Sequence, residues 1–140
     1  MCDTVERTIA SFANCFDRKD WTGLGALLTD EVELDYAALR GEVGTVPRAA
    51  YVARRESALA ALATHHLLGN LEVAVAGDVA SCRASGMIWR RQGERTFDSH
   101  VLYDFRLVRN GGVWRIAAIR QAVLWSDGDP ALHTGARAGR

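Results

Sequence analysis

Hydrophobic residues in the first part of the chain recur at the spacing of one helix face. The members of this face lie three or four residues apart: Val5, Ile9, Phe12, Ala13 and Phe16. Asp3 or Thr4 can cap this helix at its N-terminus, and we expect it to end near Arg18. Asp20 is the N-cap candidate of a second, shorter helix. Two helices therefore open the predicted fold.

A short alternating segment and a third helix are predicted next. Residues 32–36 alternate between hydrophobic and polar side chains, as a strand does. Residues 41–45 are predicted as a loop, with Thr45 as the cap of the third helix and Pro47 in its first turn. The third helix is predicted over residues 49–62.

From residue 64 onward the hydrophobic period changes from the helical value to two. Four long segments are rich in Val, Ile, Trp, Tyr and Phe: residues 64–76, 79–91, 95–109 and 113–126. The short connections between them predict consecutive hairpins and an antiparallel meander. Because these strands are much longer than the usual five or six residues, the sheet should be strongly bent, with bulges. The predicted fold class is α+β, a cone-shaped, strongly curved antiparallel sheet with three N-terminal helices on its concave side.

Length and composition limit the number of domains. The chain has 140 residues, of which 49% are hydrophobic and 24% charged, so one domain is expected. A chain of this size can bury a core without disulfides or a metal. We expect the domain to cover residues 1–127 and residues 128–140, rich in Gly, Ala and Arg, to form a flexible tail.

Charge and cysteine content exclude several classes of partner. Seventeen basic residues balance 17 acidic residues, so no net positive field would attract nucleic acid or anionic lipid. No run of 18 apolar residues could cross a membrane, and the first residues lack the apolar core of a signal peptide. The three cysteines have no metal-binding spacing. We therefore expect a cytoplasmic protein with neither a nucleic-acid nor a membrane partner.

Candidate chemistry rests on a few titratable and aromatic residues: Asp17, Tyr36, His65, His66, Trp89, His100 and Tyr103. The adjacent histidines of a strand point to opposite faces, so His65 and His66 cannot both bind one metal without a bulge. The hydrophobic pattern of this strand does not decide which of the two faces inward. His100 alternates with Tyr103 and faces away from the helices if Tyr103 packs on them.

Each candidate also has a purely structural interpretation. Asp17 could be a solvated carboxylate at a helix end, a strand histidine could be a hydrogen-bonded structural residue, and Trp89 could fill the core. No nucleophile elbow, phosphate loop or zinc motif is present. We expect no cofactor and no metal. The remaining groups suit proton transfer on a hydrophobic substrate.

Several segments resemble the nuclear transport factor 2-like superfamily, specifically its SnoaL-like branch and scytalone dehydratase. The matching segments follow the order of that family: residues 16–21, 32–36, 64–70, 77–80 and 110–116. This resemblance implies a cystatin-like α+β barrel. It also implies that Asp17 orients His66 as the catalytic base and that Tyr36 holds a water or the substrate carbonyl. The other residues expected to contact substrate are Phe16, Trp21, Trp89, His100 and Tyr103.

The sequence departs from the family pattern at two positions. Phe16 stands where the resemblance predicts a tyrosine, and Trp89 falls near the place of a second catalytic histidine. His100 or Tyr103 could replace that second proton donor. We expect a dehydratase, isomerase or cyclase that acts on a hydrophobic carbonyl compound such as a polyketide. The alternative is a non-catalytic binding protein or a structural subunit, such as a dioxygenase beta subunit.

A homodimer through the outer face of the sheet is also expected. The last predicted strand has large apolar residues on both alternating faces, whereas a sheet wet on one side alternates apolar with polar residues. One set comprises Val113, Ile119, Val123 and Trp125, and the other Trp114, Ile116 and Leu124.

Overall fold

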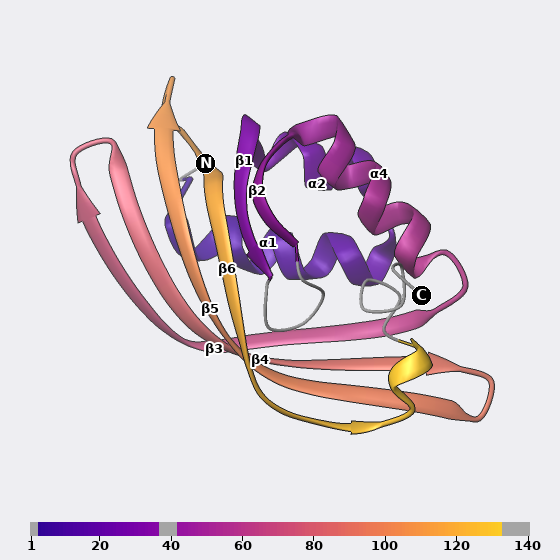
Figure 1. The fold of residues 1–140 in the computed structure, drawn as a ribbon. Coiled ribbons are helices and arrows are strands. Elements are labelled where there is room, and N and C mark those ends of the chain that lie inside the picture. The colour runs from indigo at the N-terminus through magenta and orange to yellow at the C-terminus, as the bar shows by residue number, and fades with distance from the viewer. Residues whose placement is uncertain (1–2, 37–41, 133–140) are drawn as a thin grey trace.

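The computed structural model describes residues 3–36 and 42–132 and shows helices lying against a curved sheet (Figure 1). The helices are α1 (Val5–Arg18), α2 (Trp21–Ala26), α4 (Arg48–Leu59) and the short 3-10 helix η1 (Pro130–Leu132). The strands are β1 (Leu28–Tyr36), β2 (Glu42–Pro47), β3 (Ala63–Ala76), β4 (Val79–Gln92), β5 (Arg95–Asn110) and β6 (Val113–Gly128). These elements confirm the predicted α+β class.

The strands form one sheet in the order β2-β1-β6-β5-β4-β3. Within the described residues the strands at the two ends of this order do not pair, so the sheet is open and the expected barrel is not closed. The prediction of an entirely antiparallel sheet is wrong, because β1 runs parallel to β6. Figure 1 shows α1, α2 and α4 on the concave side, as expected.

The first helix begins and ends where its sequence predicts. The Thr4 hydroxyl accepts a hydrogen bond from the Arg7 backbone N–H at 3.1 Å, which satisfies a free donor of the first turn. Lys19 ends the helix in the left-handed conformation, with φ 56°. The predicted apolar stripe is buried, and the Asp20 side chain caps α2 through Gly23 N–H at 2.9 Å.

The structure corrects the prediction for residues 41–62. Residues 42–47 form strand β2 instead of a loop, because they pair antiparallel with β1 and gain its backbone hydrogen bonds. Thr45 lies inside this strand and caps no helix, whereas Pro47 is the N-cap residue of α4. The helix ends at Leu59, three residues earlier than predicted.

Three bulges explain why the alternation of the long strands changes its phase. Strand β3 gains one residue between Gly69 and Glu72, and Asn70 there has φ 52°. His66 and Leu68 therefore face inward before the bulge, and Leu71 after it. This extra residue is the reason why the alternation of β3 did not decide between the two histidines.

Strand β6 has two further register shifts relative to β5. They turn Trp114, Ile116, Ile119 and, in part, Val123 toward the core and leave Trp125 exposed. The mixture of apolar residues on both predicted faces of this strand is thus a consequence of bulges. It is not by itself evidence that two faces are covered.

The C-terminal boundary of the fold lies later than the sequence indicated. Gly128 ends β6, and Leu132 of η1 is buried against Leu62 and Phe97. Residues 128–132 therefore belong to the folded domain, and the rest of the expected tail lies outside the described residues. No helix in the described part of the chain is long and apolar enough to cross a membrane.

Candidate active site

Asp17 and His66 meet at the junction of α1 and β3. Oδ1 of Asp17 lies 2.7 Å from Nδ1 of His66, and Oδ2 accepts the His66 backbone N–H at 2.7 Å. The Thr64 hydroxyl donates to Oδ1 at 3.1 Å. The side chains are only 9% exposed for His66 and 16% for Asp17. This arrangement excludes the interpretation of Asp17 as a solvated helix-end carboxylate.

An aromatic wall fixes the plane of the His66 ring. Phe16, the residue before Asp17, stacks on the imidazole with ring centroids 5.0 Å apart and planes 21° apart. Trp21, the first residue of α2, packs edgewise on Phe16 at 6.2 Å. The structure therefore brings two of the residues expected to contact substrate, Phe16 and Trp21, beside the Asp17–His66 pair.

Tyr36 lies in a buried cluster with two residues of α4. Its hydroxyl is 3.1 Å from the hydroxyl of Tyr51. The Arg55 guanidinium carbon lies 5.9 Å from the centroid of the Tyr36 ring and 5.4 Å from that of Tyr51. Tyr36 and Phe16 belong to the same buried cluster, so the phenol and the dyad share one interior.

Tyr103 faces the same interior from β5 and is paired with a buried amide. Nε2 of Gln121 donates to the Tyr103 hydroxyl at 2.9 Å. Gln121 is 4% exposed, and its Oε1 has no hydrogen-bond partner among the described residues. Buried carbonyl oxygens are usually satisfied, so this oxygen suits a donor group of a ligand or a water.

Register places Gln121 next to Tyr36. Asp35 of β1 pairs with Arg120 of β6, and the following residues are Tyr36 and Gln121. Tyr103, Gln121 and Tyr36 thus lie on three neighbouring strands, with Tyr51 behind them on α4. Two hydrogen-bonded pairs, Tyr36–Tyr51 and Gln121–Tyr103, therefore lie on neighbouring elements of the interior.

Arg90 contributes a second buried guanidinium to the concave face. It is 5% exposed, and its Nη1 donates to the Ser99 hydroxyl at 3.0 Å. Ser99 pairs with Ile88, which pairs with His66, so the hydroxyl lies two strands away from the imidazole in the same row.

Trp89 and His100 lie on the opposite face of the sheet. The alternating buried residues Ile88 and Arg90 point inward, so Trp89 between them points outward, where it stacks on His65 at 5.7 Å. His100 lies between the buried Ser99 and Val101 and stacks on Trp125 at 4.4 Å. The structure does not bring these two expected substrate contacts to the Asp17–His66 pair, and it places Tyr103, not His100, on the inner side.

The comparison with known families decides the assignment of the chain. A model of the SnoaL-like domain matches residues 3–120. The chain belongs to the SnoaL-like family. This confirms the resemblance to the nuclear transport factor 2-like superfamily that the sequence segments indicated.

Solved structures share the fold of this SnoaL-like chain. Kfla4162 from Kribbella flavida has a TM-score of 0.85 and 23% identity over 91% of this chain and 92% of its own. A candidate scytalone dehydratase from Novosphingobium aromaticivorans has a TM-score of 0.79 and 18% identity, covering 89% and 85% of the two chains. The type 2 hexachlorocyclohexane dehydrochlorinase LinA has a TM-score of 0.76 and 15% identity, covering 89% and 86%.

Sequence reasoning missed several polar groups of this SnoaL-like interior: Tyr51, Arg55, Arg90, Ser99 and Gln121. Tyr51 and Arg55 are four residues apart on α4, a spacing that places them on one helix face. Gln121 could have been assigned to the inner face only if the bulge of β6 were known, because alternation counted from the buried residues at the start of this strand places it on the outer face. The described residues contain no group of three or more His, Cys, Asp or Glu side chains that could hold a metal ion.

Proposed function

We propose that this SnoaL-like protein is a dehydratase, isomerase or cyclase that works without a cofactor on a hydrophobic carbonyl compound. The observation that carries the proposal is the double contact between Asp17 and His66 in a largely buried site. An ionised carboxylate accepts hydrogen bonds, so it favours the His66 tautomer with a proton on Nδ1. Nε2 then has a lone pair and can act as a base.

The first step removes a proton from the carbon next to the substrate carbonyl. Nε2 of His66 takes this proton, and the electron pair of the C–H bond forms the double bond of an enolate. Asp17 stabilises the imidazolium that results. Tyr36, whose hydroxyl is held by Tyr51, donates directly or through water to the enolate oxygen.

The second step decides between the reaction types. In a dehydration, the enolate reforms the carbonyl, the bond to a β-hydroxyl breaks, and the imidazolium returns its proton to the leaving oxygen as water. In an isomerisation, the same proton returns to another carbon. In a cyclisation the enolate carbon attacks a second carbonyl, whose π electron pair moves onto its oxygen, and this alkoxide takes the proton back from the imidazolium. No step requires an oxidant or a reductant, because the proton and electron pair balance within the substrate and His66.

The surroundings favour an apolar substrate with a few oxygen atoms. Phe16 and Trp21 form an apolar aromatic wall at the dyad. Tyr36, Gln121 and Tyr103 supply hydrogen-bonding groups in the same interior. Dehydratases and dehydrochlorinases are among the proteins that share the fold, and both names denote eliminations.

The experiment is α-proton exchange, which tests the first step without knowledge of the product. A panel of aryl ketones and β-hydroxy ketones is incubated in D₂O with the protein, and loss of the α-proton signal is followed by NMR. His66→Ala should slow the exchange by roughly 100-fold or more. Exchange that proceeds equally fast with His66→Ala would remove His66 as the base and with it the proposed function.

A further inference from the structure

The side-chain oxygen of Gln121 is a buried acceptor that the described fold does not use. Gln121 is 4% exposed, and its Nε2 donates to the Tyr103 hydroxyl at 2.9 Å, whereas its Oε1 has no hydrogen-bond partner among the described residues. An unpaired buried acceptor destabilises a fold, and an apolar side chain of similar size would avoid that penalty. The amide therefore indicates a donor group that arrives with a ligand.

The neighbours of this oxygen along its strand favour a ligand over a buried water. Gln121 is flanked on the inner side of β6 by Ile119 and Val123, which both pack in the hydrophobic core. A buried water usually makes about three hydrogen bonds. Neither flanking side chain can supply one, whereas a single donor on a ligand is enough to satisfy Oε1.

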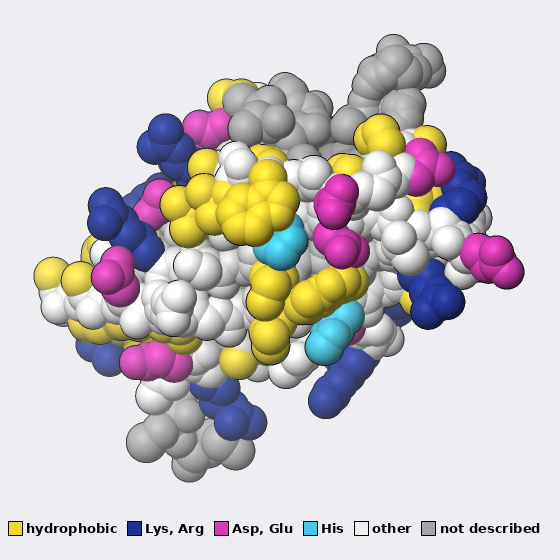
Figure 2. Space-filling model, turned by 90° about the horizontal axis from the view of Figure 1, so that it is seen from below, with side chains coloured by type: hydrophobic (Ala, Val, Ile, Leu, Met, Phe, Trp, Pro, Cys, Tyr) yellow, Lys and Arg dark blue, Asp and Glu magenta, His cyan; other side chains and the backbone are white. Residues whose placement is uncertain are grey.

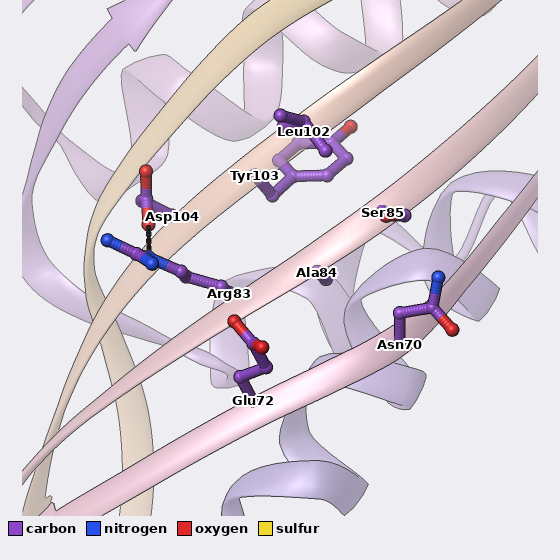
Figure 3. Close-up of a pocket in the computed structure, with 8 residues that line it drawn as sticks. All are labelled: Asn70, Glu72, Arg83, Ala84, Ser85, Leu102, Tyr103 and Asp104. Carbon is purple, nitrogen blue, oxygen red and sulfur yellow. Dashed lines mark ion pairs between the residues drawn. The ribbon is translucent and has the colours of Figure 1, made fainter.

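Register places Gln121 at a distance from the dyad along the inner face. The row of His66 contains Ile88 on β4, and the row of Gln121 contains Tyr103 on β5 and Ala84 on β4. Figure 3 shows Ala84 and Tyr103 on their neighbouring strands. Ile88 and Ala84 are four residues apart. Four residues of strand span roughly 13 Å, so a group bound at Gln121 lies away from the imidazole.

An apolar inner row separates these two rows. Its members are register partners on β3, β4, β5 and β6: Leu68, Gly86, Val101 and Val123. The side chains that alternate with this row, Leu67 and Met87, are exposed on the opposite face, and Figure 2 shows hydrophobic side chains on the surface seen from below. A ligand that reaches from His66 to Gln121 therefore lies along an apolar surface, with a polar contact at each end.

We propose that the substrate carries, besides its reacting carbonyl, a neutral hydroxyl that stays in the product and donates a hydrogen bond to Oε1 of Gln121. This inference rests on the proposed function, in which His66 handles the transferred proton. A leaving hydroxyl must gain a proton, and Oε1 has none to give. The hydroxyl at Gln121 is thus not the group that departs, and Gln121 determines specificity.

The chemistry of the interior selects a hydroxyl among the possible ligand groups. Oε1 only accepts hydrogen bonds, so a carboxylate or an ether gains none there. An ammonium would add a positive charge to an interior that already holds the Arg55 guanidinium, whose carbon lies 5.9 Å from the centroid of the Tyr36 ring. The expected substrate class is therefore a hydroxylated apolar ketone.

The first test compares probes that differ in a single donor. The probes are 5-hydroxy-1-tetralone and 7-hydroxy-1-tetralone, which are bicyclic aryl ketones, and the same two molecules with fluorine in place of the hydroxyl. Neither hydroxyl is conjugated with the carbonyl, so both stay protonated at neutral pH, as a phenol with a pKa of about 10 does. NMR titration of the full chain measures each Kd. At least one hydroxyl probe should bind about tenfold or more tighter than its fluoro analogue.

The second test removes the acceptor from the protein. Gln121→Met keeps a side chain of similar length without a strong acceptor, so the ratio of the two Kd values should fall to within about twofold of one. Val123→Ala is the matched control, because Val123 is the next inner residue of β6 and offers no acceptor. It should weaken both probes alike and leave the ratio unchanged. Circular dichroism verifies that each variant is folded.

A purely structural role of Gln121 gives a different result. If the amide only held Tyr103 in place, Gln121→Met would weaken both probes by the same factor and the ratio would survive. That outcome would overturn the inference. So would a wild-type protein that binds no hydroxyl probe, or that binds neither hydroxyl probe more tightly than its fluoro analogue, and this comparison needs no variant.

α-Proton exchange of the same probes in D₂O separates this inference from the proposed function. Preferential binding of a hydroxyl probe without any exchange would contradict the proposed function and leave Gln121 as a hydroxyl-binding residue. Exchange that is equally fast for the hydroxyl and fluoro probes, with equal Kd values, would contradict the inference and leave His66 as the base.

Discussion

The carboxylate of Asp17 binds His66 twice, at ring Nδ1 and at the backbone N–H, each at 2.7 Å. The two contacts use the two oxygens of one carboxylate, so the same group anchors β3 to α1 and holds the imidazole ring. The Thr64 hydroxyl adds a third contact, at 3.1 Å. This geometry fixes both the orientation of the imidazole and which of its nitrogens faces the interior.

The first prediction concerns the pH profile of Asp17→Asn. With a substrate identified by α-proton exchange, kcat/KM should fall by roughly 100- to 10,000-fold. The acid limb of the profile should also move to lower pH, because the neighbouring negative charge that stabilises the imidazolium is lost. An acid limb that stays in place would contradict electrostatic contact between Asp17 and His66.

Thr64→Val is the matched control for this experiment. It removes the 3.1 Å hydrogen bond to Asp17 but keeps the carboxylate and its charge. We expect a loss of about tenfold in kcat/KM, the scale of one hydrogen bond, with the acid limb close to that of wild type. A shift as large as that of Asp17→Asn would indicate that packing, not charge, controls His66.

The second prediction concerns the coupled hydroxyls of Tyr36 and Tyr51. Tyr36→Phe should lower kcat/KM by roughly 100-fold if the phenol donates to the enolate oxygen. Tyr51→Phe should lower kcat/KM less, by about tenfold, because it removes only the hydroxyl that positions the Tyr36 hydroxyl from 3.1 Å away. The double variant should be no worse than Tyr36→Phe, since the two act as one unit. Multiplicative losses in the double variant would show that the hydroxyls act separately.

The hydrophobic pattern predicted the long elements because their periods persist over many residues. Helix α1 and strands β3 to β6 agree with the sequence within a few residues at each end. Strand β2 was missed because its six residues include Gly44 and Pro47, and only pairing with β1 makes them a strand. The parallel pairing of β1 with β6 is likewise a tertiary contact that no local pattern records.

Because of the bulges, hydrophobic alternation predicted only part of the site. One extra residue at Asn70 inverts the faces of β3, so the residues on both sides of it cannot be assigned with a single phase. The same effect in β6 hid Gln121 on the inner face. The pairing of Asp17 with His66 was implied by the family resemblance, whereas the buried Arg55 and Arg90 contradict the hydropathy rule and were not predicted.

The third prediction uses two glycines with opposite surroundings. A Cβ on Gly86 would lie 2.8 Å from Leu68 Cδ2 and 3.1 Å from both Tyr103 and Val101. Gly86→Ala should therefore lower the free energy of unfolding by about 1–3 kcal/mol through overpacking. Urea unfolding at fixed protein concentration measures this change.

Gly25→Ala is the control for Gly86→Ala. A Cβ on Gly25 meets only Val52, at 3.8 Å, and the residue lies inside α2. The substitution should raise the free energy of unfolding by about 0.5–1 kcal/mol, since alanine favours a helix over glycine. A free energy of unfolding that Gly86→Ala leaves unchanged or raises, as expected for Gly25→Ala, would show that the contacts of Gly86 are not tight.

The fourth prediction concerns alkaline stability and Cys82. Burial of this thiol and, to a smaller extent, the negative charge of Glu6 raise its pKa from 9.0 to about 11. In the unfolded chain the thiol ionises above its ordinary pKa, while in the folded protein it stays protonated until about pH 11. The folded state therefore binds more protons in this interval, and stability falls as pH rises. The slope from this one group is about 1.4 kcal/mol per pH unit.

Urea unfolding at pH 7, 9, 10 and 11 in the presence of a reductant tests this for wild type and Cys82→Ala. Other groups that titrate in this range contribute equally to both proteins, so the difference between the two profiles isolates Cys82. Cys82→Ala should be less stable at pH 7, because Cys82 is 1% exposed and its removal leaves a cavity. The difference between their free energies of unfolding should then narrow from pH 9 to 11, because only wild type loses the contribution of the protonated thiol. Parallel profiles would show that the thiol ionises in the folded protein as readily as in the unfolded chain.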